Sequence, residues 1–265
     1  MKNGCENLIL EGKHALVCGA SKGIGRATAK LLAARGAEVT LLARSVDALQ
    51  TLKAEIEADG GKARALIMDL EDRSTLIEGL EKLSSDAPAV NILINNTGGP
   101  PGGPLLAAEV GAMETALGRH LFASHTLVQA LLPGMKSEGY GRIINVLSTS
   151  VREPIPNLGV SNLTRAAVAS WAKTLSSELP PGVTINNVLP GFTDTERLGS
   201  LGEATATRLG KSPEEVRQGW IAQIPEGRLA QPEETAEAIA FLASPAGAYI
   251  RGHSIPVDGG RLRSI

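Results

Sequence analysis

A hydroxyl and a guanidinium stand four residues apart in the stretch GVSNLTRAAVASWAKTLSSEL, residues 159–179. Apolar residues recur there every three or four positions, which predicts a helix. On such a helix Ser161 and Arg165 share one face, one turn apart. A positive charge held beside a hydroxyl can stabilise a developing alkoxide on a bound substrate. The simpler alternative is a surface turn that carries a cation.

A second candidate for chemistry is the glycine-rich stretch HALVCGASKGIGRATAKLLAARG, residues 14–36. It reads as a strand, a tight turn and a helix. The glycines permit close approach of the backbone to a pyrophosphate, which binds at the helix N-terminus. The alternative is an ordinary strand-to-helix turn. We expect the turn to bind a dinucleotide through Gly19, Ser21, Lys22, Gly23, Ile24 and Gly25.

The end of the next apolar run, LLARS, bears on which dinucleotide binds. A carboxylate there would bind the ribose 2′-hydroxyl and favour NAD, but this chain has Ala43 followed by Arg44. Arg44 and Lys22 are two cations that can hold a 2′-phosphate, so the sequence favours NADP(H) over NAD(H). The alternative is two solvated surface cations. Asp69, at the end of IMDL, either contacts adenine or caps the next helix, and its neighbour Leu70 is expected beside the cofactor.

The elements that must position these residues alternate along the whole chain. Seven apolar runs rich in β-branched residues are separated by stretches with helical periodicity. This order predicts an α/β fold: a single-domain Rossmann fold over residues 1–265, with a doubly wound parallel sheet of about seven strands and helices on both faces. The glycine- and proline-rich run at 97–105 should border the ligand crevice, because it follows a strand. The runs are HALVCG, AEVTLLA, ARALIMD, VNILINN, GRIINVLS, VTINNVL and HSIPVD.

The composition excludes several classes of protein. Of 265 residues 43% are hydrophobic and 20% charged, and the net charge is −2. No basic cluster suits nucleic acid, no apolar run has membrane-spanning length, and no metal-ligand cluster stands out. Cys5 and Cys18 form no disulfide framework, and Cys18 ends an apolar run as a small buried residue would. We therefore expect a cytoplasmic protein with a small-molecule ligand.

Four motifs in series give the chain a family resemblance. They are GASKGIG at 19–25, INNTG at 94–98, NVLPGFTDT at 187–195 and RGHSIPVDGG at 251–260. Together they resemble the short-chain dehydrogenase/reductase family over roughly residues 10–260. Within this family the chain most resembles 3-oxoacyl-carrier-protein reductases and sugar or alcohol dehydrogenases. The resemblance implies a nicotinamide cofactor, a carbonyl or alcohol substrate and a homotetramer.

The resemblance also implies further cofactor contacts and a lid. Residues 192–220 should form a flexible cover over the substrate. Thr97 stands where the family has alanine. The residues expected beside the cofactor are Asn95, Thr97, Gly98, Pro190, Gly191, Thr193 and Thr195.

Catalysis in this family rests on a serine, a Tyr-x-x-x-Lys motif and an asparagine. Ser148 in INVLSTS fills the serine position, whereas Ser161, Arg165 and His120 fall on the tyrosine, lysine and asparagine positions. By the resemblance Arg165 also faces the ribose of the cofactor. An alkyl hydroxyl is a weaker acid than a phenol, and a guanidinium does not release its proton. His120 is either a proton-transfer group or a packed helix residue.

Two functions therefore stay open. One is an NADP(H)-dependent oxidoreductase of the carbonyl/hydroxyl type with altered proton delivery. The other is a catalytically inactive NADP-binding homologue that acts as a sensor or an assembly partner. The absent Tyr-x-x-x-Lys motif is the feature that separates them, since Tyr140 and Tyr249 lie in other segments.

Overall fold

The computed structural model describes residues 8–264 and shows an α/β molecule built on one seven-stranded sheet. Each of the seven apolar runs contributes one strand, as the sequence predicts. Cys5 lies outside the described residues. The strands are β1 (His14–Cys18), β2 (Glu38–Ala43), β3 (Lys62–Ile67), β4 (Ile92–Asn95), β5 (Gly141–Val146), β6 (Val183–Pro190) and β7 (Ser254–Val257).

The strand order sets where a ligand can bind. All neighbouring strands are parallel, in the order β3-β2-β1-β4-β5-β6-β7. The direction of winding reverses between β1 and β4, so the loops after these two strands diverge and leave a crevice at their carboxyl ends. The glycine-rich turn follows β1, and the loop that begins at Asn96 follows β4. The two predicted ligand-binding loops therefore meet at the switch point.

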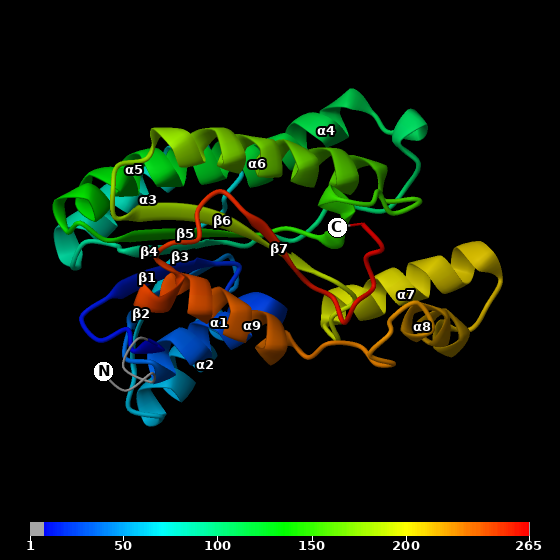
Figure 1. Cartoon of the computed structure of the whole chain (residues 1–265), viewed down its shortest axis with the longest axis horizontal. Helices are drawn as coiled ribbons and strands as arrows, with labels where there is room; N and C mark the ends of the chain where they lie inside the picture. Colours follow the sequence, from blue (N-terminus) through cyan, green and yellow to red (C-terminus); the bar gives the residue numbers. More distant parts are fainter. Residues whose placement is uncertain (1–7, 265) are drawn as a thin grey trace.

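Helices cover both faces of the sheet, as Figure 1 shows. On one face lie α3, α5 and α6, and on the other lie α1, α2 and α9. Each layer closes a core against the sheet, one containing Leu32, Leu49 and Ile239 and the other Leu76 and Leu127. Their bounds are α1 (Gly23–Ala34), α2 (Val46–Ala58), α3 (Arg73–Asp86), α5 (Ala123–Ser137), α6 (Gly159–Glu178) and α9 (Pro232–Ala243).

Strand β1 ends at a residue whose chemistry the core suppresses. Cys18 has no exposed surface, and burial raises the pKa of its thiol to about 12. A thiol this hard to ionise is inert, because the thiolate is the reactive form. Cys18 is therefore the small buried residue that the sequence predicts.

The helix before α5 is interrupted close to the crevice. Helix α4 (Val110–Leu117) continues into a π-helical turn (Gly118–Phe122) and then into α5. A π-turn inserts one extra residue and shifts the register of the side chains that follow, and such turns are frequent at functional sites. His120 lies in this turn.

Residues 192–220, predicted as a flexible cover, are largely helical. They contain α7 (Glu196–Leu209) and α8 (Pro213–Ile221), which project beyond the sheet in Figure 1. The Thr195 hydroxyl caps α7, and Ser212 begins α8 with a capping box. Phe192 stacks on Trp220 with ring centroids 5.2 Å apart, which packs α8 against the start of the segment. The glycine content alone did not reveal these helices.

In the part of the chain that the structure describes, no helix is long and apolar enough to cross a membrane.

Candidate functional site

A large cleft opens at the carboxyl ends of the strands and runs from the glycine-rich turn to α7. Its volume is about 1530 Å³, well above the roughly 300–1,000 Å³ of a typical single-ligand pocket. It has room for a dinucleotide and a second molecule. Nearly all of the residues predicted from the sequence as site residues line it. Those that do not are Gly25, Asn95 and His120.

The glycine-rich turn is held by close backbone contact. Gly19 has φ +61°, and a Cβ at Gly25 would lie 2.2 Å from the Gly19 carbonyl oxygen. Asn96, which the sequence analysis did not single out, donates from Nδ2 to the carbonyl oxygens of Cys18 and Gly19 at 3.3 Å each. The absence of a side chain at Gly25 therefore lets the start of α1 pack against the Gly19 carbonyl group. Asn96 joins the loops that follow β1 and β4.

The first turn of α1 is suited to an anion. The N-cap residue, Lys22, makes no side-chain cap, and the first turn contains no acidic residue. Its backbone N–H groups therefore have no side-chain acceptor and can bind a phosphate. At the opposite wall, a Cβ built on Gly98 would meet no atom within 4 Å, so open space faces the backbone there. These features fit a dinucleotide cofactor.

Asn95 points into the sheet instead of the cleft. Its Nδ2 donates to Asn145 Oδ1 at 2.8 Å, Asn145 Nδ2 donates to Asn187 Oδ1 at 2.8 Å, and Asn187 Nδ2 donates to Ser254 Oγ at 2.9 Å. We call this chain the asparagine ladder. It links β4, β5, β6 and β7 directly beneath the cleft. The side chain facing the glycine-rich turn is that of Asn96, so the structure places the second asparagine of INNTG at the turn, and not Asn95 as the sequence predicts.

Lys22 and Arg44, the two cations expected to bind a 2′-phosphate, each have a carboxylate nearby. Arg44 Nη1 lies 3.5 Å from Asp69 Oδ2, and Lys22 Nζ lies 3.0 Å from Glu196 Oε2. Most of the Lys22 and Arg44 side chains is exposed. Exposed ion pairs contribute little, so either cation can turn to another anion at small energetic loss.

Ser161 and Arg165 face the cleft as a bonded pair. Arg165 Nε donates to Ser161 Oγ at 3.3 Å, and Nη1 donates to the carbonyl oxygens of Val146 and Leu147 at 3.2 and 2.7 Å. Arg165 therefore fastens α6 to the end of β5. Burial and the charge of Arg197 lower the pKa of Arg165 to about 10, which leaves it protonated at neutral pH. Since Ser161 Oγ accepts from a cation, its own O–H is free to donate into the cleft.

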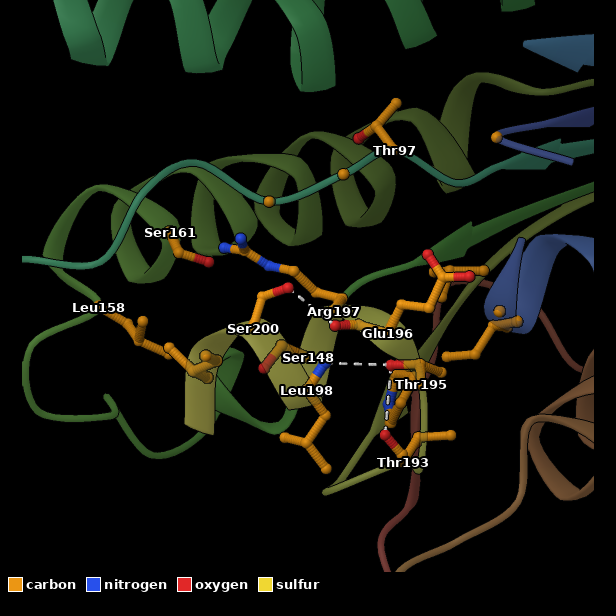
Figure 2. Close-up of a pocket in the computed structure, with 18 of the residues that line it drawn as sticks. Thr97, Ser148, Leu158, Ser161, Thr193, Thr195, Glu196, Arg197, Leu198 and Ser200 are labelled. Atoms are coloured by element: carbon orange, nitrogen blue, oxygen red, sulfur yellow. Dashed lines mark hydrogen bonds between the residues drawn. The ribbon is translucent and has the colours of Figure 1, made fainter. Parts of the chain in front are cut away.

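Ser148 stands on the adjoining wall (Figure 2). It directly follows Leu147, whose carbonyl Arg165 binds, and its Oγ accepts from the backbone N–H of Ser150 at 3.1 Å. This bond orients the hydroxyl and again leaves its proton free. The two serines and Arg165 thus present donors and a positive charge to the same cleft.

The structure separates His120 from the cleft by one side chain. His120 is 5% exposed, and its Nδ1 is hydrogen-bonded to the hydroxyl of Thr97, which lines the cleft. Burial, followed by the charges of Arg165 and Arg119, lowers the pKa of His120 to about 3. The imidazole is therefore neutral at physiological pH and lies behind Thr97 as a packed residue.

Neither tyrosine reaches the cleft. Tyr140 donates from its hydroxyl to the carbonyl oxygen of Ala243 at 2.6 Å, with the Lys13 and Arg142 cations over its ring. Tyr249 is fully exposed at the surface. Among the residues that the structure describes, no phenol lines the cleft.

Arg197, in the first turn of α7, also lines the cleft, although the sequence does not indicate it. Its Nη2 donates to the carbonyl oxygen of Pro100 at 2.7 Å, so it bridges the cleft from α7 to the loop after β4. Figure 2 shows this side chain running across the cleft toward the wall that carries Ser161. No sequence motif marks it; the helical capping signal at Thr195 places it in a first turn but gives no direction for its side chain.

Comparison with known proteins gives relatives along nearly the whole chain. A family model described as enoyl-(acyl carrier protein) reductase matches residues 19–261. The 3-oxoacyl-(acyl-carrier-protein) reductase FabG of Vibrio cholerae is 37% identical over 254 residues, which cover 95% of this chain and 98% of that protein. The gluconate 5-dehydrogenase of Gluconobacter oxydans is 32% identical over 257 residues, 97% of each chain.

A solved structure shows the same likeness in three dimensions. The L-sorbose reductase of Gluconobacter frateurii, complexed with NADPH and L-sorbose, superposes with a TM-score of 0.92 at 28% identity. The match covers 98% of this chain and 100% of that one.

Proposed function

Because the chain belongs to the short-chain dehydrogenase/reductase family, we propose that its cleft interconverts a carbonyl and a hydroxyl group with NADP(H). The family membership makes it an NAD(P)-dependent oxidoreductase. The finer parts of the proposal are the preference for NADP(H), the residues that hold the substrate oxygen, and the source of the proton.

Two cations beside the glycine-rich turn and the end of β2 support the preference for NADP(H). Lys22 and Arg44 both line it, and Ala43 leaves no carboxylate at the end of β2 to repel a 2′-phosphate. A phosphate would replace Glu196 and Asp69 as the partner of these two exposed cations. The pyrophosphate would bind at the first turn of α1, and Thr97, Gly98, Pro190, Gly191, Thr193 and Thr195 would lie along the rest of the cofactor.

The single observation that best supports the proposed reaction is the hydrogen bond from Arg165 to Ser161 inside the cleft. We propose that these two residues occupy the positions of the family's tyrosine and lysine. The bound cofactor supplies or accepts the hydride at the substrate carbon. Ser148 and Ser161 donate hydrogen bonds to the substrate oxygen, and Arg165 places a positive charge beside it, so negative charge developing on that oxygen is stabilised.

The proton has a different origin from the one the family motif implies. Ser161 is too weak an acid, Arg165 stays charged, and His120 is neutral and screened by Thr97. We propose that water in the cleft exchanges the proton with the substrate oxygen. General acid catalysis typically contributes about 10²- to 10⁴-fold in rate, so simple ketones should react slowly and activated carbonyls better.

The experiment is cofactor oxidation across a panel of ketones, diketones and keto sugars, with NADPH and NADH in parallel. We expect NADPH oxidation with at least one activated carbonyl, weakened by Arg165→Ala. Lys173→Ala is the matched control, because it removes a cation from the same helix outside the cleft. If NADPH binds but no carbonyl is reduced, the protein is a nucleotide-binding homologue without this activity.

The remaining proposals concern the whole protein. We propose that residues 192–220 act as the lid of the cleft, since Phe192, Arg197 and Trp220 all line it. We also propose a cytoplasmic homotetramer. Fractionation of the source cells and the mass in solution test the last two points.

A further inference from the structure

The cleft wall carries more positive charge than the neighbouring carboxylates neutralise. Seven lysine or arginine residues and two carboxylates line the cleft, in a chain whose net charge is −2. Three of the seven cations are paired with carboxylates within residues 8–264. The pairs are Lys22 with Glu196, Arg44 with Asp69 and Arg119 with Glu71.

The other four cations have no carboxylate within 4 Å in that part of the chain. Arg165, Arg197, Arg208 and Arg261 lie on α6, on α7 and after β7, outside the glycine-rich turn, which the start of α7 contacts through Lys22 and Glu196. Arg261 is already engaged, since it donates to Thr149 Oγ1 at 3.0 Å and lies over the Phe192 ring. The unneutralised charge is thus concentrated on the part of the cleft wall formed by α6, α7 and the segment after β7.

Arg165 and Arg197 converge on one point. A Cβ built on Gly99 would lie 3.4 Å from Arg165 Nη2 and 3.5 Å from Arg197 Nη2. Arg165 Nη2 has no acceptor among the described residues, while its Nε and Nη1 fix the rest of the group. Arg197 is fixed through Nη2 to Pro100 O, and its Nε and Nη1 have no acceptor there. Both groups are therefore positioned, and both have donors to spare.

Two guanidinium groups that border the same space repel each other unless an anion lies between them. Burial lowers the pKa of Arg165, and the nearby charge of Arg197 lowers it further, the direction that such repulsion gives. A carboxylate or phosphate oxygen matches guanidinium donors in geometry and charge. Glycine at position 99 leaves the space between the groups free of a side chain.

We propose that the substrate is an oxyanion, a molecule carrying a carboxylate or phosphate group that binds between Arg165 and Arg197 next to the reacting carbonyl. This inference rests on the proposed function for the identity of the reacting group, but the anion site itself is defined by the two arginines and Gly99. Arg197 acts in substrate binding, and Arg165 contributes its charge to both the anion and the substrate oxygen.

Binding of unreactive anions tests the site without any turnover. Malonate and inorganic phosphate are titrated by calorimetry into the protein saturated with NADP⁺, with malonamide as the neutral probe. We expect saturable binding of at least one anion and none of malonamide, and the better anion identifies the acid group. Arg197→Gln should weaken binding by about tenfold to a hundredfold, the value of one charged hydrogen-bonding partner.

Two further variants separate local from general effects. Lys211→Gln removes a positive charge from the same segment outside the cleft and should leave anion affinity unchanged. Arg197→Lys keeps the charge without the fork and should recover part of the affinity. Thermal unfolding of each variant verifies that α7 is intact.

Three outcomes overturn the inference. They are the absence of saturable anion binding, equal binding by wild type and Arg197→Gln, and displacement of NADP⁺ by the anion, which would assign the arginines to the cofactor. The proposed function fails by a separate result, the absence of cofactor oxidation with any carbonyl. If the protein reduces carbonyls, it should prefer acetoacetate to its methyl ester, and Arg197→Gln should lose this preference. That result would support both the proposed reaction and the anion site.

Discussion

At the scale of single residues, our proposal for the Ser161–Arg165 pair is that a helix keeps the electrostatics of an acid–base site without its acid. The guanidinium is held by two carbonyl oxygens and by Ser161 Oγ, so its charge is fixed in place. A fixed charge costs no reorganisation when an oxyanion forms. Neither residue is an acid that releases a proton near neutral pH, so we propose that the pair supplies binding and charge only.

Arg44 is expected to set the choice of cofactor. Arg44→Asp removes a partner of the 2′-phosphate and adds repulsion, so the ratio of NADH to NADPH affinity should rise by about tenfold or more. Titration calorimetry of both cofactors with wild type and variant measures it. Arg35→Gln is the matched control, since Arg35 lies outside the cleft. A wild-type protein that binds NADH as tightly as NADPH contradicts this prediction.

His120 is expected to make the protein sensitive to acid. In the unfolded chain its imidazole binds a proton near pH 6.5, whereas in the fold its pKa is about 3. Between these two pKa values the unfolded chain binds more protons than the folded protein. The contribution of His120 to the free energy of unfolding is therefore fully present above about pH 6.5 and is lost as the pH falls. The loss is at most about 1.4 kcal/mol per pH unit for this group.

Urea unfolding at pH 7.5 and pH 5 tests the assignment. His120→Asn should reduce the fall in unfolding free energy between the two pH values. Part of the fall should persist, because burial also lowers the pKa of His14. An unchanged pH dependence in His120→Asn would show that the imidazole is not protected as the structure indicates.

Most of the residues that residue types and motif spacing indicate as site residues line the cleft, while their roles stay predictions. Ser148, Ser161 and Arg165 line it together because the strand-to-helix connections of a parallel sheet end at one edge. Asn95 was misplaced because alternate residues at a strand end point in opposite directions, and the motif does not state which asparagine faces the turn. Arg197 was missed because the path of a side chain across a cleft depends on tertiary packing.

At the scale of elements, the asparagine ladder ties four strands together beneath the site. Asn145 is fully buried, and Asn145→Ala leaves Asn95 Nδ2 and Asn187 Oδ1 without their partners. Each unmade bond costs about 1–3 kcal/mol, so we expect a loss of about 2–5 kcal/mol in unfolding free energy.

Urea denaturation measures this loss, with Ser254→Ala as the comparison. Ser254 ends the ladder on the edge strand and is partly exposed, so water can replace its hydroxyl. We expect it to lose less than Asn145→Ala. Equal and small losses for both variants would mean that the ladder does not stabilise the sheet.

The regular elements were predictable and the special ones were not. All seven strands appear where apolar runs predict them, because strands covered on both faces must be apolar throughout. The helices α7 and α8 were hidden because glycine at 199, 202 and 210 suggests a loop, while Gly202 actually accommodates the Trp220 ring. The π-turn at His120 has no periodic signal of its own, because it shifts the pattern by one residue.

At the scale of the whole molecule, three large apolar side chains in the segment around α4 are exposed, and they bear on the predicted oligomer. Leu106 is fully exposed, and Val110 and Phe122 are 67% and 55% exposed, all within or next to α4 and the π-turn. Large exposed apolar side chains can mark contacts between subunits when they form one patch.

We expect a homotetramer, because the family resemblance implies one and homo-oligomers usually have closed symmetry. Light scattering at micromolar concentration measures the mass. Leu106→Glu should weaken association if this surface lies at an interface, whereas Ile77→Glu, an exposed residue of α3, serves as the control. A monomeric mass for the wild-type protein contradicts the expectation.

The measurement that tests the central claim most directly is single-turnover NADPH oxidation with a reactive diketone. Wild type is compared with Ser161→Ala and with Ser161→Tyr/Arg165→Lys. We propose that the Ser161 hydroxyl binds the substrate oxygen without donating the proton, and that Ser148 and Arg165 still stabilise this oxygen when Ser161 is absent, so Ser161→Ala should slow the reaction by less than about tenfold. The double variant restores a phenol and an ammonium and should accelerate reduction by about 10²-fold or more. A large loss in Ser161→Ala, with the double variant no faster than wild type, would contradict the account and make Ser161 part of a different proton path.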